Sequence, residues 1–467
     1  MEHINQTRRL RDLDRRFLER YDLVGPRYTS YPTAPHWNGS VGDAELRARL
    51  EGLGPAGPER PLSLYVHLPF CIERCAYCAC NVIVAPRPEA VSESYVRRLE
   101  REASLWTAHL DIARPVGQLH WGGGTPTYLN ADLLRRLHAI ISRRFLLAPD
   151  AEQSIEIHVT WTTDEQLRTL ADVGFNRVSM GVQDFNEATV AAIGRRQTIE
   201  RTAEVINRCR GLGFKGINVD LIYGLPHQSV ESFAATIDVV LGMRPDRLAV
   251  YNFAYLPGRM EHQRRIDPAA LPSGAEKLGI LLEAHDRLVG AGYRHIGMDH
   301  FALPGDELAR AAEEGTMQRN FMGFTTRAGS DLVGMGVSAI SSIDGLDAQN
   351  FKDLASYEQA LEAGRFPIER GLALGGEDLL RRDVIQAIMC RDRIDKETIE
   401  QRHGISFDTH FAEELARLGP MVEDELLNVS GETIELTFLG RLFARNIAMV
   451  FDQHLARSRP VTYSRTL

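Results

Sequence analysis

The chain has 467 residues, of which 44% are hydrophobic and 25% are charged, and its formal net charge is −9 at pH 7. This composition is typical of a globular protein with a sizeable core, and the acidic balance argues against broad nucleic-acid binding. No stretch approaches the roughly 20 apolar residues of a membrane helix, and the first residues lack the apolar segment of a secretory signal. We therefore expect a cytoplasmic protein that binds neither membranes nor nucleic acid.

The first 60 residues are expected to form an arm with helices. An amphipathic pattern predicts a helix over roughly residues 6–21, and another is expected over Asp43–Leu53. Between them, Gly25–Thr33 has two prolines and two tyrosines and no helical period. This pattern indicates an extended segment that lies on another surface. The segment is either a packed extension only or also a part of a binding site.

From Pro61 onwards, short apolar runs alternate with longer amphipathic segments such as Asp132–Phe145 and Ile199–Leu212. This alternation predicts parallel strands joined by crossover helices. The expected strands are Leu62–Leu68, Gln118–Trp121, Ser154–Val159, Arg177–Val182, Ile217–Tyr223 and Arg247–Phe253. An α/β fold follows, either an open six-stranded (β/α)6 partial TIM barrel or an open doubly wound sheet. The barrel is favoured because polar and glycine residues lie in or after the runs, as at the mouth of a βα barrel.

After about residue 260 the alternation loosens. A helix is expected over Glu276–Val289, a strand over Arg294–Met298, and a glycine-rich turn over residues 334–340. The predicted domains are the arm (1–60), the barrel with its extension (61–345) and a C-terminal domain (346–467).

The C-terminal domain is predicted to be mostly helical. A hairpin is expected over Leu426–Val429 and Thr433–Leu436, followed by one long helix over Gly440–Leu455. Helices followed by a small hairpin resemble a winged-helix module. Since the chain is acidic and has no basic stripe, this module is expected to be a structural lid rather than a DNA-binding domain.

Four of the six cysteines lie within ten residues, directly after the first predicted strand; they are Cys71, Cys75, Cys78 and Cys80. They are too crowded for a disulfide framework and suit a loop around a metal centre. A structural zinc site would use two separate cysteine pairs, and a ferredoxin-like cluster would need a fourth cysteine elsewhere. Cys209 and Cys390 both lie in helical patterns, so each is expected to be a buried apolar residue.

The spacing of Cys71, Cys75 and Cys78, with an aromatic residue before the last cysteine, resembles the signature of the radical S-adenosylmethionine (SAM) superfamily. This resemblance implies a [4Fe–4S] cluster on three thiolates, with one iron left open to SAM. Gly122–Gly124 is similar to the turn that holds the methionine part of SAM in that superfamily, and glycine lets the backbone approach a ligand closely. In the superfamily, an electron from the cluster cleaves SAM to a 5′-deoxyadenosyl radical.

Nearly the whole chain resembles the oxygen-independent coproporphyrinogen III oxidases. The segments that carry the resemblance are residues 25–33, 64–71, 78–81, 119–127, 179–185, 220–226, 297–302 and 334–340. The resemblance implies oxidative decarboxylation of two propionates of coproporphyrinogen III, giving protoporphyrinogen IX in haem biosynthesis. It also implies two SAM molecules, a donor of electrons to the cluster and a monomer. Cys80 distinguishes this branch from related haem chaperones.

The resemblance also implies the site residues. Tyr65, Glu156 and Asp220 would be catalytic, and Cys71, Cys75 and Cys78 would bind the cluster. Contacts to the cluster-bound SAM would come from Tyr65, Gly123, Glu156 and Ile340. Contacts to the second SAM would come from Tyr77, Gly124, Thr125, Gln183, Arg195, Asp220 and Ala254. Carboxylates suit hydroxyl or amino groups, and an arginine suits the carboxylate of a methionine group.

One segment departs from the family pattern. Where the family has Asp-Pro-Arg after the third strand, this chain has His158-Val159-Thr160. The change leaves the cluster and SAM residues intact and affects the expected placing of the substrate, for which Arg27 of the arm is a candidate carboxylate ligand. Alternative functions are a paralogue that acts on another tetrapyrrole and a non-catalytic haem chaperone.

Overall fold

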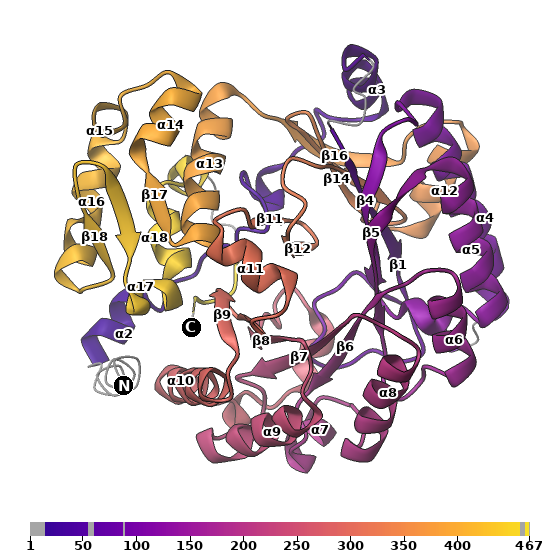
Figure 1. The fold of residues 1–467 in the computed structure, drawn as a ribbon, viewed down its shortest axis with the longest axis horizontal. Coiled ribbons are helices and arrows are strands. Elements are labelled where there is room, and N and C mark those ends of the chain that lie inside the picture. Colours follow the sequence, from indigo (N-terminus) through magenta and orange to yellow (C-terminus); the bar gives the residue numbers. More distant parts are fainter. Residues whose placement is uncertain (1–14, 55–59, 87–88, 458–462, 467) are drawn as a thin grey trace.

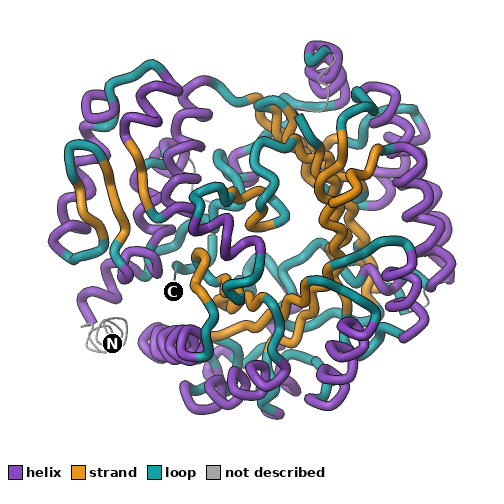
Figure 2. The backbone as a smooth tube through the Cα atoms, viewed as in Figure 1, coloured by secondary structure: helices purple, strands orange, loops and turns teal. Residues whose placement is uncertain are grey.

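The structure is a computed structural model that describes residues 15–54, 60–86, 89–457 and 463–466. Its centre is a curved sheet in which six parallel strands are consecutive neighbours, with helices along the outer side (Figures 1 and 2). This arrangement confirms the predicted partial barrel. The six strands are β1 (Leu62–Leu68), β4 (Pro115–Gly123), β5 (Leu146–Ile157), β6 (Arg177–Gln183), β7 (Gly216–Tyr223) and β8 (Arg247–Asn252).

Further strands lengthen both edges of the sheet, which has twelve strands in all. β13 (Asp331–Met335) pairs in parallel with β1, so that Tyr65 lies opposite Gly334. This strand includes part of the segment that was predicted to be a turn. The remaining strands are antiparallel: β14 (Ile340–Ile343), β15 (Leu346–Asn350) and β16 (Ile368–Ala373) beyond β13, and β10 (His300–Ala302) and β9 (Arg294–Gly297) beyond β8.

The crossover helices begin at polar caps that satisfy their first backbone N–H groups. The side chains of Asn130, Thr163 and Ser229 each accept a hydrogen bond from the backbone N–H of the residue three positions later in the chain. The helices are α4 (Glu89–His109), α5 (Ala131–Arg144), α6 (Asp164–Asp172), α7 (Glu187–Ala192), α8 (Ile199–Gly211), α9 (Val230–Met243) and α10 (Gly274–Gly290). The predicted helices over Asp132–Phe145, Ile199–Leu212 and Glu276–Val289 are therefore confirmed. Within the described ranges, no helix is long and apolar enough to cross a membrane.

The C-terminal part lies beside the barrel (Figure 1). Its elements are α13 (Gly376–Arg391), β17 (Arg393–Asp395), α14 (Lys396–His403), α15 (Phe407–His410), α16 (Ala412–Glu423), β18 (Leu427–Val429), β19 (Thr433–Leu436), α17 (Phe438–Leu442), α18 (Ala444–Val450) and α19 (Gln453–Arg457). The predicted hairpin is confirmed as β18 and β19. The predicted long helix over Gly440–Leu455 is wrong, because the chain turns at Phe443 and Phe451, and the Asp452 side chain caps the last helix by accepting from the His454 N–H.

The arm packs against this C-terminal part. Residues 6–14 of the first predicted helix lie outside the described residues, and α2 (Arg15–Tyr21) is its described remainder. The second predicted helix is confirmed as α3 (Asp43–Gly52). Tyr28 and Tyr31 are buried in one apolar cluster with the C-terminal helices, and the Tyr28 hydroxyl donates to Asp452 Oδ2 at 2.9 Å. The arm is thus packed on another surface, as predicted, and its part in a binding site stays a prediction.

Shorter elements connect these parts. They are η1 (Ala34–His36), β2 (Phe70–Cys71), β3 (Ile83–Val84), η2 (Pro126–Tyr128), η3 (Glu261–Arg265), η4 (Pro268–Ala270), α11 (Glu307–Glu313), β11 (Gln318–Asn320), β12 (Gly323–Thr325) and α12 (Leu354–Glu362). The domain boundary at residue 345 stays a prediction, although β15 and β16 beyond it pair with the same sheet.

Candidate active site

The cysteine loop lies at the mouth of the barrel, where β1 ends. The Ala85 N–H donates to the Cys71 carbonyl at 3.0 Å. From η3, His262 Nε2 donates to the Cys78 carbonyl at 2.6 Å and Gln263 Nε2 to the Tyr77 carbonyl at 3.2 Å. Below the loop lies an apolar cluster made of Ala76, Ile193, Ile222, Leu225, Phe253 and Ile266. The loop is therefore held from both sides with its thiols toward the barrel mouth.

The glycine turn after β4 fits directly against this loop. The Gly124 N–H donates to the Leu68 carbonyl at 2.9 Å, and Thr125 Oγ1 lies 3.5 Å from Cys71 Sγ. Gly123 has a φ of +113°, and a Cβ there would lie 2.4 Å from the His67 ring. Only glycine suits such a backbone position. The turn therefore presents bare backbone beside the thiols.

Two carboxylates from neighbouring parts of the sheet differ in their protonation. Burial opposes ionisation of Glu156, but hydrogen bonding to His120 and to the Gly123 N–H outweighs it and lowers its pKa. Burial and the nearby charge of Glu156 raise the pKa of Asp220 to about 7, although Asn218 and Ser179 donate to it at 2.8 and 3.2 Å. Near neutral pH, Glu156 is therefore an acceptor only, whereas Asp220 is partly protonated.

Arg195 and Gln183 complete the polar wall. Arg195 Nη1 lies 3.7 Å from Cys75 Sγ, and its Nε donates to Gln197 Oε1 at 3.0 Å. Gln183 has a φ of +70°, a conformation that is costly for a side chain of this kind. Its Oε1 is buried without a hydrogen-bond partner among the described residues. This unpaired acceptor fits an amino or hydroxyl group of a ligand.

The thiols differ in their environments. Burial raises the pKa of Cys71 to about 11, whereas a hydrogen bond from the Cys80 side chain lowers the pKa of Cys78 to about 7. Among the described residues, no three His, Cys, Asp or Glu side chains are grouped around a single metal ion. Thiolates are the usual ligands of iron–sulfur clusters, and Cys71, Cys75 and Cys78 instead face one larger pocket. Cys209 and Cys390 are buried, as predicted.

This pocket has an empty volume of about 1130 Å³. It brings together most of the predicted site residues, namely Cys71, Cys75, Tyr77, Cys78, Gly123, Gly124, Thr125, Glu156, Gln183, Arg195 and Asp220. A second chamber of about 820 Å³ inside the barrel shares Glu156, Ser179, Asp220 and Tyr251 with it.

Three predicted residues are not among those that line the pocket. The Tyr65 ring stacks on His120 at 5.8 Å. The Ala254 carbonyl accepts from Gln263 Nε2 at 3.0 Å, and the backbone of Ile340 lies against Gly334. Their contacts to a cofactor stay predictions.

The site also contains residues that the sequence analysis did not single out: Ser179 and Tyr251 line both the pocket and the second chamber, and His120 lines the second chamber. Side chains two residues apart on a strand share a face. Three pairs share a strand face in this way: Ser154 with Glu156, Ser179 with Gly181, and His120 with Gly122. The period of two in the predicted strands was the signal that could have found His120 and Ser179.

The departing segment after β5 also faces the pocket. His158 and Trp161 both line it. Burial and the charge of Arg195 lower the pKa of His158 to about 3, and its Nδ1 accepts from the Thr160 N–H at 3.3 Å. His158 is therefore neutral and presents its Nε2–H as a donor.

Comparison with known proteins agrees with this geometry. Residues 65–240 match the family model of the radical SAM superfamily, and residues 374–443 match that of the HemN C-terminal domain. The chain is 45% identical over 459 residues to the oxygen-independent coproporphyrinogen III oxidase of Pseudomonas aeruginosa, a match that covers 97% of this chain and 98% of that protein. It is 40% identical to the enzyme of the same name from Helicobacter pylori, over 98% of this chain and 100% of that protein.

The fold is likewise similar to a solved structure. Coproporphyrinogen III oxidase (HemN) from Escherichia coli, a radical SAM enzyme, superposes with a TM-score of 0.87 and 45% sequence identity. The superposition covers 91% of this chain and 97% of that chain.

Proposed function

Since this chain belongs to the oxygen-independent coproporphyrinogen III oxidases, a family of radical SAM enzymes, we propose that it oxidatively decarboxylates two propionates of coproporphyrinogen III. The product is protoporphyrinogen IX. The observation that carries this proposal is the single pocket that joins three thiols, a bare glycine turn and two carboxylates in different charge states.

The side chains divide into groups with separate tasks. Cys71, Cys75 and Cys78 hold the [4Fe–4S] cluster. Gly123 and Glu156 hold the cluster-bound SAM, with Tyr65 and Ile340 at its edge. When bound, the cluster and SAM supply the 5′-deoxyadenosyl radical that removes a hydrogen atom from the propionate β-carbon.

A second set of polar groups would hold a second SAM. Arg195 pairs with its carboxylate, because a guanidinium forms a strong charge-assisted bond there. Gln183 Oε1 and Asp220 accept from its amino or hydroxyl groups, and Tyr77, Gly124, Thr125 and Ala254 complete its surroundings. The protein works as a monomer with a separate electron donor.

Arg27 connects the arm to the substrate. Its guanidinium forms an ion pair with Asp299 and lies 5.4 Å from the centre of the Tyr251 ring, and Tyr251 lines the pocket. Arg27→Ala is expected to raise the KM for coproporphyrinogen III about tenfold or more, by loss of a charge-assisted bond to a propionate. An unchanged KM in steady-state kinetics would exclude this role.

Anaerobic turnover tests the proposed reaction. The holoenzyme with reconstituted cluster receives SAM, a reductant and coproporphyrinogen III, and protoporphyrinogen IX and 5′-deoxyadenosine are measured by chromatography. We expect both products. 5′-Deoxyadenosine without decarboxylated porphyrinogen would point to another tetrapyrrole substrate, in line with the altered segment at His158. Neither product, from protein with an intact cluster, would refute the enzymatic function.

A further inference from the structure

Three arginines from distant parts of the chain, two of them buried and Arg27 half-buried, surround one buried carboxylate. Arg27 comes from the arm, Arg319 from β11 and Arg445 from α18, and each interacts electrostatically with Asp299. Arg27 alone forms an ion pair with it. In the described part of the chain, neither Arg319 nor Arg445 has a carboxylate within ion-pair distance. The cluster thus carries positive charge beyond what Asp299 balances.

Arg319 shows most clearly that a partner is missing. It is 6% exposed, and its Nε and Nη1 have no hydrogen-bond partner among the described residues. Its backbone is fixed by Gln386, which both donates to the Arg319 carbonyl at 2.6 Å and accepts from its N–H at 3.2 Å. The guanidinium lies 4.7 Å from the centre of the Phe324 ring. An unpaired buried guanidinium is costly, which makes an anionic ligand favourable here.

Arg445 is hydrogen-bonded but not neutralised. Its Nε donates to the Pro26 carbonyl at 2.9 Å and its Nη2 to the Gly25 carbonyl at 2.5 Å. Its Nη1 also donates to the Arg465 carbonyl at 3.2 Å. All three partners are neutral carbonyls, so they fix the arm without balancing the charge. Burial and the neighbouring charge of Arg27 lower the pKa of Arg445 to about 9, which is the effect expected of an electropositive site.

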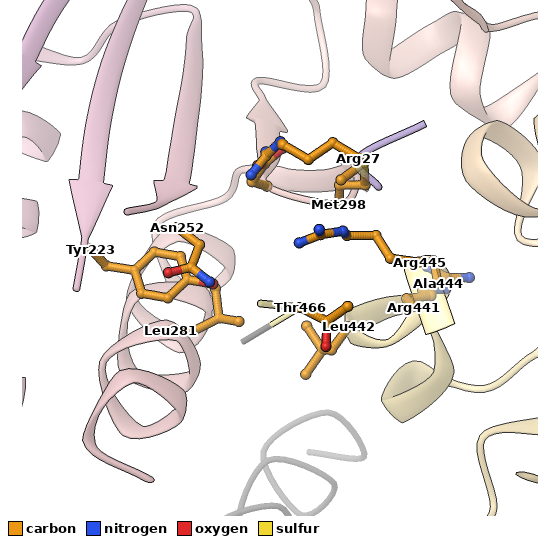
Figure 3. A pocket seen from close by; sticks show the side chains of 11 residues that line it. Arg27, Tyr223, Asn252, Leu281, Met298, Arg441, Leu442, Ala444, Arg445 and Thr466 are labelled. Carbon is orange, nitrogen blue, oxygen red and sulfur yellow. The ribbon is translucent and has the colours of Figure 1, made fainter. Parts of the chain in front are cut away.

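Arg27, Asp299 and Arg445 line one cavity, and the Phe324 ring on which Arg319 lies lines the second chamber inside the barrel. Figure 3 shows the guanidinium groups of Arg27 and Arg445 extending toward Tyr223 and Asn252 across a cavity of about 450 Å³. Asn252 follows Tyr251, which lines the catalytic pocket, and its Oδ1 has no hydrogen-bond partner within the described ranges. This cavity is less than half the size of the catalytic pocket, so it suits the carboxylate side chains of a ligand rather than its macrocycle.

We propose that Arg319 and Arg445 join Arg27 around Asp299 in an anion site that binds carboxylates of the tetracarboxylate substrate while its macrocycle lies in the catalytic pocket. This inference rests on the proposed function, because it takes the ligand to be a porphyrinogen with propionates. Asp299 orients Arg27 in the absence of substrate. The ligand's carboxylates supply the negative charge that the cluster lacks.

Binding of coproporphyrin III to the anaerobic holoenzyme tests the site without turnover. Fluorescence titration would compare this tetra-acid with its uncharged tetramethyl ester. Arg319→Met is expected to weaken binding of the acid at least tenfold and to leave the ester unchanged, and Arg319→Lys should restore part of the loss. Arg143→Met, on the exposed face of α5, is the matched control and should bind both as the unaltered protein does.

A substitution of opposite sign separates ligand binding from a structural role. Asp299→Asn removes the competing carboxylate and should tighten binding of the acid, whereas a merely structural cluster would be weakened by Asp299→Asn and Arg319→Met alike. That second result, or equal loss of acid and ester in Arg319→Met, would overturn the proposal. SAM cleavage and thermal unfolding report on folding of each variant. Binding of the acid by the unaltered protein, together with no decarboxylation of coproporphyrinogen III in the anaerobic turnover assay, would refute the proposed reaction and leave this site supported. Inorganic phosphate that competes as well as the acid would refute a substrate site.

Discussion

Asp220 and Glu156 face the same pocket and differ in charge state because of their hydrogen-bond partners. Glu156 accepts a hydrogen bond from the Gly123 N–H, and its Oε1 lies 3.6 Å from His120 Nε2, so its ionised form is favoured. Asp220 has only neutral donors, and burial together with the nearby charge of Glu156 raises its pKa to about 7. The two carboxylates are therefore separated in their titration although both line the same pocket.

This difference predicts a pH dependence of SAM binding. Below pH 7 Asp220 is mostly protonated and loses acceptor capacity, so affinity for the second SAM should rise as the pH increases from 6 to 8, by up to about tenfold per unit below the pKa. Equilibrium dialysis of SAM with the anaerobic holoenzyme between pH 6 and 8 measures this affinity. Asp220→Asn should bind more weakly and with a flatter profile. An equal slope in that variant would assign the titration to another group.

Between elements, the buried carboxylate of Glu102 connects several parts of the barrel wall. It lies on α4 and accepts from the Gly336 N–H at 2.7 Å, from Asn350 Nδ2 at 2.7 Å and from the Tyr357 hydroxyl at 2.5 Å. It thereby ties α4 and α12 to the turn after β13, the strand that pairs with β1. Burial raises its pKa to about 7 in spite of these donors.

Stability should therefore fall with rising pH through this group. The unfolded chain releases the Glu102 proton near its usual pKa and the folded protein only near pH 7, so the folded state binds more protons in between. The free energy of unfolding is expected to drop by about 3 kcal/mol between pH 4.5 and 7 from this residue alone. Urea unfolding at several pH values measures this drop. The free energy of unfolding of Glu102→Gln should not show it, and equal pH profiles of the variant and the unaltered protein would contradict the prediction.

Elements with a strong local pattern were predictable from the sequence. The first strand was predicted over the residues of β1, because an apolar run there lies between two prolines. β13 was not predicted, since Gly334 gives it the look of a turn while its partner β1 lies far away in sequence. The long C-terminal helix was wrong for a similar reason: Gly440 fits against the Leu426 carbonyl, a contact that local periodicity cannot show.

For the whole molecule, parts of the site that depend on contacts between distant segments were likewise not predictable from local sequence patterns. The cysteine loop and the glycine turn are local motifs, each of which can be recognised in one short segment of the sequence. The arginine cluster has no local signature, because Arg27, Arg319 and Arg445 come from three separate regions and meet only after the arm has packed on the C-terminal helices. The family resemblance supplied the cofactor residues, and the geometry alone brought the arginines together.

The pairing of β1 with β13 also has a consequence during synthesis on the ribosome. The thiols of the cysteine loop emerge about 260 residues before β13 is made, which at a usual elongation rate of about 5–20 residues per second is a delay of about 13 to 50 seconds. The arm waits longer still, since Val24 pairs with Arg465 near the end of the chain. A nascent chain thus carries the thiols with an unfinished barrel edge until β13 is made, and the arm can pair only after Arg465 has been made.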